Sequence, residues 1–276
     1  MAKQSDVVIA FAGLSPSLEG EEMPVKLDGF SGGDRTAIDL PAVQEELLKA
    51  LAATGKPLVV VLQNGSALAV NWAQQNANAI LEAWYPGEEG GTAIAEALAG
   101  DNNPAGRLPV TFYSSLSQIP AFDDYSMKGR TYRYFSDKPL YGFGFGLSYT
   151  NFAYSSLAVS ASNINAGDPV TVECDVKNTG SAAGDEVVEL YLTQPKAFET
   201  PLRVLAGFTR VHLDPGQSTH VGLTIDLRSI AQVDAKGVRM ILPGEYTVWL
   251  GGAQPDEATS VQTGRFTVVG KAILDK

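Results

Sequence analysis

The chain has 276 residues and a formal net charge of −11, with 31 acidic and 20 basic side chains. This length leaves room for two domains that each bury a core, and 45% hydrophobic against 18% charged residues describes a globular protein. The acidic balance argues against a nucleic-acid partner, and no apolar stretch reaches the roughly 18 residues that a membrane-spanning helix needs.

Thiol and metal chemistry are not indicated by the residue counts. Cys174 is the single cysteine, so no internal disulfide can form. With only His212 and His220 the chain cannot assemble a zinc-type ligand cluster, and we expect no metal and no cofactor. Both histidines are interpreted as ordinary surface residues. The sequence begins without the apolar core of a signal peptide, which leaves a cytoplasmic protein or a chain trimmed at that end.

From residue 6 to about 110, apolar strands alternate with amphipathic helices. The predicted elements are a strand at 7–12, a helix at 40–53, a strand at 57–62, a helix at about 67–76, a strand at 79–84 and a helix at about 89–99. Such alternation predicts a mostly parallel sheet with helices on both faces.

A long acidic loop, residues 13–35, follows the first of these strands and carries Glu19, Glu21 and Glu22. Loops of more than about 12 to 15 residues without secondary structure are uncommon in compact domains, and are usually functional or disordered. The flanking strand and helix favour a functional loop. Ligands of parallel sheets bind outside the carboxyl ends of the strands, so the acidic loop, 63–65 and 85–91 should share one rim.

From about residue 153 the apolar period drops to two. Alternate residues from Val170 to Val176 are apolar, and the pattern recurs at 221–225 and 246–250 with turn residues between the runs. This pattern predicts an antiparallel β-sandwich, with Cys174 on its inward face. The segment 136–152 is rich in glycine and aromatic residues, so we expect a connector packed against both domains rather than a flexible linker.

Several motifs, spread in order over nearly the whole chain, resemble family 3 glycoside hydrolases, specifically bacterial β-glucosidases and β-xylosidases. The matching segments are Leu18-Glu-Gly-Glu-Glu-Met-Pro24, Gly32-Gly-Asp-Arg35, Trp84-Tyr-Pro-Gly87 with Gly90-Gly91, Gly106-Arg-Leu-Pro-Val-Thr-Phe112 and Tyr141-Gly-Phe-Gly-Phe-Gly-Leu-Ser-Tyr-Thr150. The resemblance implies an α/β sandwich domain at 1–135, the connector at 136–152 and a fibronectin type III-like domain at 153–276.

The resemblance also implies an activity and an absence. Family members hydrolyse β-linked oligosaccharides or aryl glycosides with retention, and they usually begin with a TIM-type barrel that carries the catalytic aspartate in a Ser-Asp-Trp context. That motif does not occur here. The resemblance therefore implies that a barrel domain, in cis or in trans, supplies the nucleophile.

In the family, the general acid/base glutamate lies on the acidic loop, after a glycine and before Gly-Asp-Arg. By this resemblance Glu21 is the first choice and Glu22 the second, with Glu19 a third alternative. Carboxylates crowded on a turn should also raise one another's pKa, as a general acid requires.

Other polar and aromatic residues near the predicted rim are weaker candidates. Trp84 and Tyr85 could stack on a sugar ring, although an aromatic at a strand end belongs more often to the core. Arg35 could contact substrate, but Asp34 and Arg35 are interpreted as an ion pair that braces the loop. Residues 88–89 open a helix, where carboxylates offset the helix dipole.

Three hypotheses remain open. The chain could complete a glycosidase active site with a barrel domain, it could be an enzyme that uses two carboxylates of the acidic loop, or it could be a non-catalytic carbohydrate-binding or assembly module. An exposed apolar face would favour a homo-oligomer in the third case. We favour the first hypothesis for the biochemical family and the third for the behaviour of the chain alone.

Overall fold

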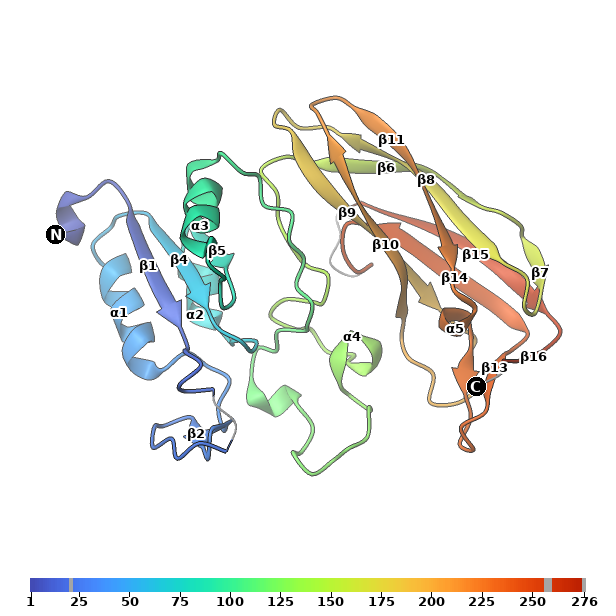
Figure 1. Cartoon of the computed structure of the whole chain (residues 1–276), viewed down its shortest axis with the longest axis horizontal. Coiled ribbons are helices and arrows are strands. Elements are labelled where there is room, and N and C mark those ends of the chain that lie inside the picture. Colours follow the sequence, from blue (N-terminus) through green and yellow to red (C-terminus); the bar gives the residue numbers. More distant parts are fainter. Residues whose placement is uncertain (20–21, 256–259, 275–276) are drawn as a thin grey trace. The chain divides into compact units, whose positions relative to one another are not determined.

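The computed structural model describes residues 1–19, 22–255 and 260–274, which fall into two compact units (Figure 1). The first unit contains Met1–Asn102, Thr111–Asp124 and Asp137–Tyr141. The second contains Asn103–Val110, Tyr125–Ser136 and Gly142–Lys276. The units thus interleave along the chain between residues 102 and 142. The domain boundaries at 135 and 152 stay predictions.

The first unit is built on a three-stranded parallel sheet in the order β1-β4-β5. Its strands are β1 (Val8–Gly13), β4 (Leu58–Gln63) and β5 (Ala79–Glu82). Val8 lies opposite Leu58, and Val59 lies opposite Ala79. The central strand β4 is buried along most of its length, whereas Ile9 and Phe11 of the edge strand β1 are 45% and 58% exposed.

Three helices accompany this sheet, α1 (Ala42–Ala52), α2 (Asn71–Asn76) and α3 (Gly90–Ala99), so the alternation of strands and helices is confirmed. Leu48 of α1 is buried against the sheet core. Helix α2 begins later than predicted, because Ala69 pairs with Ile38 and Asp39 in an extended conformation. Helix α3 ends at Gly100, whose φ of 84° is the left-handed conformation that glycine adopts most easily.

The acidic loop contains a small hairpin that the sequence pattern did not predict. Strand β2 (Phe30–Ser31) pairs with β3 (Asp34–Arg35) in antiparallel register. The two residues between them, Gly32 and Gly33, have φ values of 61° and 93°. Residues other than glycine rarely adopt such positive φ values. This Gly-Gly turn reverses the loop and directs Arg35 back toward the sheet edge.

The second unit is a β-sandwich with a small additional sheet. Its strands are β6 (Phe152–Val159), β7 (Asn163–Asn165), β8 (Val170–Asn178), β9 (Gly184–Thr193), β10 (Val204–Leu213), β11 (Ser218–Ile225), β12 (Gln232–Val233), β13 (Arg239–Ile241), β14 (Gly244–Gly251), β15 (Val261–Val269) and β16 (Ala272–Ile273). The sheet orders are β10-β9-β14-β15-β7, β11-β8-β6 and β12-β13-β16. Neighbouring strands are antiparallel except that β7 runs parallel to β15. Two short helices, α4 (Thr131–Tyr134) and α5 (Leu227–Ile230), also belong to this unit.

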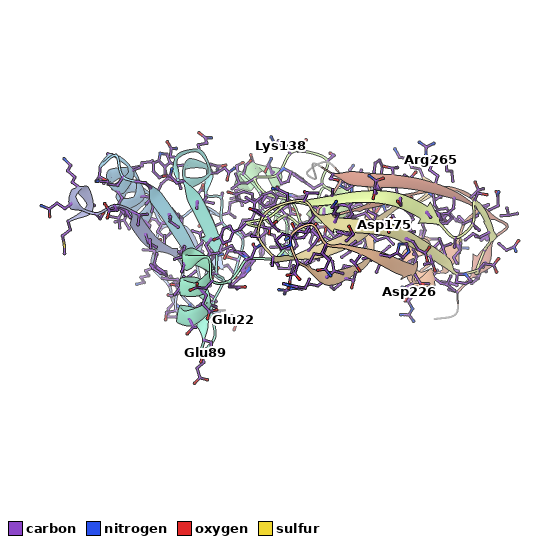
Figure 2. All side chains as sticks on the ribbon, turned by 90° about the horizontal axis from the view of Figure 1, so that it is seen from above. Glu22, Glu89, Lys138, Asp175, Asp226 and Arg265 are labelled. Atoms are coloured by element: carbon purple, nitrogen blue, oxygen red, sulfur yellow. The ribbon has the colours of Figure 1, made fainter. Side chains whose placement is uncertain are left out.

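The period of two in this half is confirmed by burial. Along β8, Val170, Val172, Cys174 and Val176 are fully buried in the shared core of both large sheets, and the residues between them point outward. Asp175 is one of the outward residues (Figure 2) and contacts His220 across the strand pair at 2.8 Å. Within the described residues, no helix is long and apolar enough to cross a membrane.

Candidate functional site

The carboxylate of Glu19 lies where three sheet-edge loops of the first unit meet. It accepts hydrogen bonds from the backbone N–H of Gly65 at 2.9 Å, from the Ser66 hydroxyl and from the Tyr85 hydroxyl. Gly65 and Ser66 follow β4, and Tyr85 follows β5. These contacts confirm that the acidic loop, the turn after β4 and the turn after β5 share one rim.

Arg35 completes this cluster from the hairpin. Its Nη1 lies 3.8 Å from Glu19 Oε1 and donates to Ser66 Oγ at 3.0 Å. Its other nitrogens donate to the carbonyl oxygens of Ala37 and Asp39 at 2.9 and 3.1 Å. Arg35 therefore braces the loop as expected, but its carboxylate partner is Glu19 and not Asp34. Asp34 and Arg35 are successive residues of β3, whose side chains point to opposite faces, and Asp34 is exposed.

The chemistry of Glu19 is that of an ionised anchor. Burial tends to raise the pKa of this carboxyl, but hydrogen bonds from Ser66, Tyr85 and Gly65 and the charge of Arg35 together hold its pKa below the usual value. Contrary to the expectation from crowded carboxylates, the pKa of Glu19 is lowered, because hydrogen-bond donors and the Arg35 charge act on it. In this arrangement Glu19 holds the loop and is poorly suited to release a proton at neutral pH.

Trp84 and Tyr85 form the turn that ends β5. Trp84 has a φ of 54°, a left-handed conformation that is strained for an aromatic residue. Its ring packs edge-on against the Phe112 ring, with the ring centroids 5.9 Å apart. This packing makes Trp84 part of the local core, whereas Tyr85 is 37% exposed and hydrogen-bonded to Glu19. Any contact of Trp84, Tyr85 or Arg35 with a sugar stays a prediction.

A second carboxyl, which the sequence analysis did not single out, lies below this turn. Glu82 Oε1 accepts from the Trp84 backbone N–H at 3.0 Å, and Glu82 Oε2 lies 3.4 Å from Asn64 Nδ2. Burial raises the pKa of Glu82 to about 7. Asn64 is fully buried, and its Oδ1 has no partner among the described residues. Glu82 thus accepts from both the Trp84 turn and the Asn64 side chain, and links the end of β5 to the turn after β4.

The residues proposed for proton transfer occupy the same loop. Glu21 lies outside the described residues, so its prediction is untested. Glu22, labelled in Figure 2, is exposed. Its φ of 52° lies in the left-handed region. Glu89, also labelled there, stands at the start of α3, where its carboxylate accepts from Thr92 Oγ1 at 3.0 Å. Its predicted effect on the helix dipole stays a prediction, since the carboxylate makes no hydrogen bond to a backbone N–H of the helix start.

Elsewhere in the described part of the chain, the residues form neither a metal site nor a reactive thiol. Across the residues that the structure describes, no three His, Cys, Asp or Glu side chains gather closely enough to hold a metal ion. Cys174 is buried, and burial raises the pKa of its thiol to about 12, which keeps it unreactive. The rim around Glu19 is thus the best candidate for a functional site.

Comparison with known proteins identifies the family of the chain. Residues 1–149 match the glycosyl hydrolase family 3 C-terminal domain, and residues 186–254 match the fibronectin type III-like domain. The chain belongs to glycoside hydrolase family 3. The acidic loop, the turn after β4 and the turn after β5 all lie within the first of these matches.

Relatives in this family are named as β-xylosidases and β-glucosidases. The chain is 46% identical to xylan 1,4-beta-xylosidase of Xylanibacter ruminicola. The alignment covers 91% of this chain and 29% of that protein. The chain is 39% identical to the periplasmic beta-glucosidase of Salmonella typhimurium, and the alignment covers 91% of this chain and 33% of that protein. The chain thus spans about a third of these relatives.

Solved structures of β-glucosidases share the fold. A β-glucosidase from Erythrobacter marinus is 36% identical with a TM-score of 0.84, covering 97% of this chain and 35% of that one. A family 3 β-glucosidase from Bifidobacterium adolescentis is 33% identical with a TM-score of 0.84, covering 97% of this chain and 40% of that one.

Proposed function

We propose that this chain is the C-terminal portion of a retaining family 3 β-glycosidase and supplies the general acid/base from its acidic loop. Glu21 is the proposed residue and Glu22 the second choice. The aspartate nucleophile comes from a TIM-type barrel domain in cis or in trans. The substrate class is a β-linked oligosaccharide or aryl glycoside with a terminal glucosyl or xylosyl residue.

One observation carries this proposal: the acidic loop is tied to the sheet rim immediately before the proposed acid/base. Glu19 receives three hydrogen bonds and the charge of Arg35, and Glu21 stands two residues later. A general acid must be held within hydrogen-bond reach of the bond it protonates. The anchor at Glu19, two residues before Glu21, supports this requirement.

The proposed chemistry divides between two carboxyl groups. The protonated glutamic acid gives its proton to the glycosidic oxygen as the carbon–oxygen bond breaks, and the aspartate attacks the anomeric carbon to form a glycosyl-enzyme. The resulting glutamate then takes a proton from water, whose oxygen displaces the aspartate. Retaining enzymes hold the two groups about 5 to 5.5 Å apart, so the loop must face the barrel closely.

The decisive experiment measures hydrolysis of p-nitrophenyl β-glucoside and β-xyloside by the chain alone, and by the chain with a separately expressed family 3 barrel domain. Inactivity alone with rescue by the barrel is expected. Activity of the chain alone would contradict the proposal, because it would require a nucleophile within these residues. No activity in either sample would leave a non-catalytic module as the better description.

The role of Glu21 is tested in the rescued complex. Glu21→Gln should lower kcat/KM for p-nitrophenyl substrates by about 10²–10⁴-fold, the usual share of general acid–base catalysis. A 2,4-dinitrophenyl glycoside should be affected much less, because its leaving group needs little protonation. Added azide should accelerate turnover of this variant, since azide attacks the glycosyl-enzyme without a base. The same pattern in Glu22→Gln or Glu19→Gln, with Glu21→Gln unaffected, would move the assignment to that residue.

An assembly module is the second candidate, favoured by the exposed face of the edge strand β1. Ile9 and Phe11 expose about half of their side chains beside an unpaired strand edge, which is a typical template for association. Sedimentation of the purified chain, compared with an Ile9→Lys variant, tests this. A concentration-dependent dimer that the variant abolishes would support it, and a monomer at all concentrations would refute self-assembly.

A further inference from the structure

The second unit contains a cavity of about 230 Å³ that none of the preceding chemistry uses. Helix α4 contributes Arg133, strand β10 contributes Val204 and Leu205, and helix α5 contributes Arg228 and Ser229. A smaller cavity of about 130 Å³ adjoins it and shares Arg133. The larger space holds a single small molecule rather than a chain segment.

The walls of this cavity are held in place by hydrogen bonds within the unit. The Tyr132 hydroxyl accepts from the Leu205 N–H at 3.1 Å, and the Tyr132 ring stacks on Phe143 with centroids 4.3 Å apart. The Gln194 amide donates to the carbonyl oxygens of Ser229, Ile230 and Ala231 at 2.8 to 3.1 Å. The cavity is therefore a preformed feature of the sandwich.

Arg133 is the unusual group in this cavity. Its Nε atom is buried and has no hydrogen-bond partner among the described residues. A buried guanidinium N–H without an acceptor is costly, because it has lost its water without a replacement. Its only described charge-related contact is with the Tyr134 ring, whose centroid lies 5.8 Å from the guanidinium carbon.

Two other guanidiniums of the described residues, both largely covered, pair with carboxylates. Arg107 lies 2.7 Å from Glu186, and Arg35 lies 3.8 Å from Glu19. In contrast, neither Arg133 nor Arg228 forms an ion pair with any described residue, although acidic side chains outnumber basic ones by 31 to 20. The cavity thus holds two guanidiniums without a protein carboxylate between them.

Nearby carboxylates are directed elsewhere. Asp226 (Figure 2) caps α5 by accepting from the Arg228 backbone N–H at 2.7 Å. Glu199 lines the smaller cavity and not the larger one. An anion in the larger cavity would consequently face Arg133 and Arg228 and keep away from Glu199.

We propose that this cavity binds a small hydroxylated carboxylate of the size of one sugar acid. The planar guanidinium of Arg133 matches a carboxylate geometrically, and Arg228 adds the second positive charge. The Ser229 hydroxyl is available to a ligand hydroxyl, and Val204 and Leu205 form the apolar wall that the carbon skeleton would contact. This site is separate from the glycosidase chemistry proposed above.

Titration calorimetry of the 276-residue chain with sodium D-glucuronate tests the site, with D-glucose, sodium acetate and sodium sulfate as comparison ligands at constant ionic strength. Saturable binding of glucuronate is expected, at least tenfold tighter than acetate or sulfate, with no heat from glucose. Equal binding of sulfate and glucuronate would overturn the sugar-acid assignment, and absence of saturable binding by glucuronate would overturn the site.

Variants locate the binding. Arg133→Met keeps the apolar stem of the side chain, removes the charge and should weaken glucuronate binding at least tenfold. Arg228→Met should do the same, and because Arg228 is exposed this second variant does not endanger folding. Arg265→Met is the matched control, since Arg265 is exposed on β15 (Figure 2). Unchanged binding in Arg228→Met, or equal loss in Arg265→Met, would contradict the proposal.

Discussion

Replacing Glu19 by glutamine should release the acidic loop without unfolding the first unit. The amide keeps one oxygen, which can still accept from Gly65 and Tyr85, but its NH2 group faces Ser66 and Arg35 in place of a charged oxygen. Hydrogen bonds to a charged group contribute about 1.5 to 3 kcal/mol each. Loss of the charge should therefore cost about 2 kcal/mol of loop stability.

Limited trypsin digestion at Lys26, which is exposed within this loop, measures the effect. Because about 1.4 kcal/mol corresponds to a tenfold change in population, Glu19→Gln should increase cleavage after Lys26 about 30-fold. Glu22→Gln is the matched control and should leave the rate unchanged, since Glu22 is exposed and has no described hydrogen bond. Equal rates for the wild type and Glu19→Gln would refute the anchoring role.

The same contacts make the loop sensitive to acid. The pKa of Glu19 is held below its usual value of 4.5, so the folded state favours the ionised form. The anchor is fully present above pH 4.5 and is lost as the pH falls through the lower folded-state pKa. Exchange of the Gly65 amide hydrogen should accelerate in this acidic range beyond the intrinsic rate change, and Glu19→Gln should remove the extra pH dependence.

Three further changes test the buried polar groups. Tyr85→Phe removes one donor to Glu19 and should cost roughly 0.5 to 1.5 kcal/mol of loop stability, measured by the same digestion at Lys26. Burial raises the pKa of Glu82 to about 7, so the folded state holds a proton that the unfolded state releases, and stability falls as the pH rises from 4.5 to 7. Glu82→Gln should flatten this fall. In urea unfolding at pH 8, the variant should be more stable than the wild type by about 1 to 3 kcal/mol. Glu186→Ala should lower the free energy of unfolding by about 3 to 5 kcal/mol, because it leaves the Arg107 charge buried and unpaired; a loss below 1 kcal/mol would contradict this role.

Local patterns in the sequence determined much of this protein. Apolar residues at helical spacing and short apolar runs predicted the alternating elements of the first unit, and alternation along β8 predicted its buried face, because side-chain direction follows directly from backbone period. The motifs around Gly32–Arg35 and Tyr141–Thr150 indicated the family, and the comparisons confirmed it. These inferences needed only residues that are close together in the chain.

The tertiary structure alone decided which distant groups meet. Glu19 is separated by 46 residues from Gly65 and by 66 from Tyr85, and no spacing rule in the sequence joins them. For the same reason the partner of Arg35 was mispredicted as its neighbour Asp34. Whether the pKa of a carboxyl is lowered or raised depends on the hydrogen-bond donors and the burial around it. In this protein, loops that meet only at the folded sheet edge supply both.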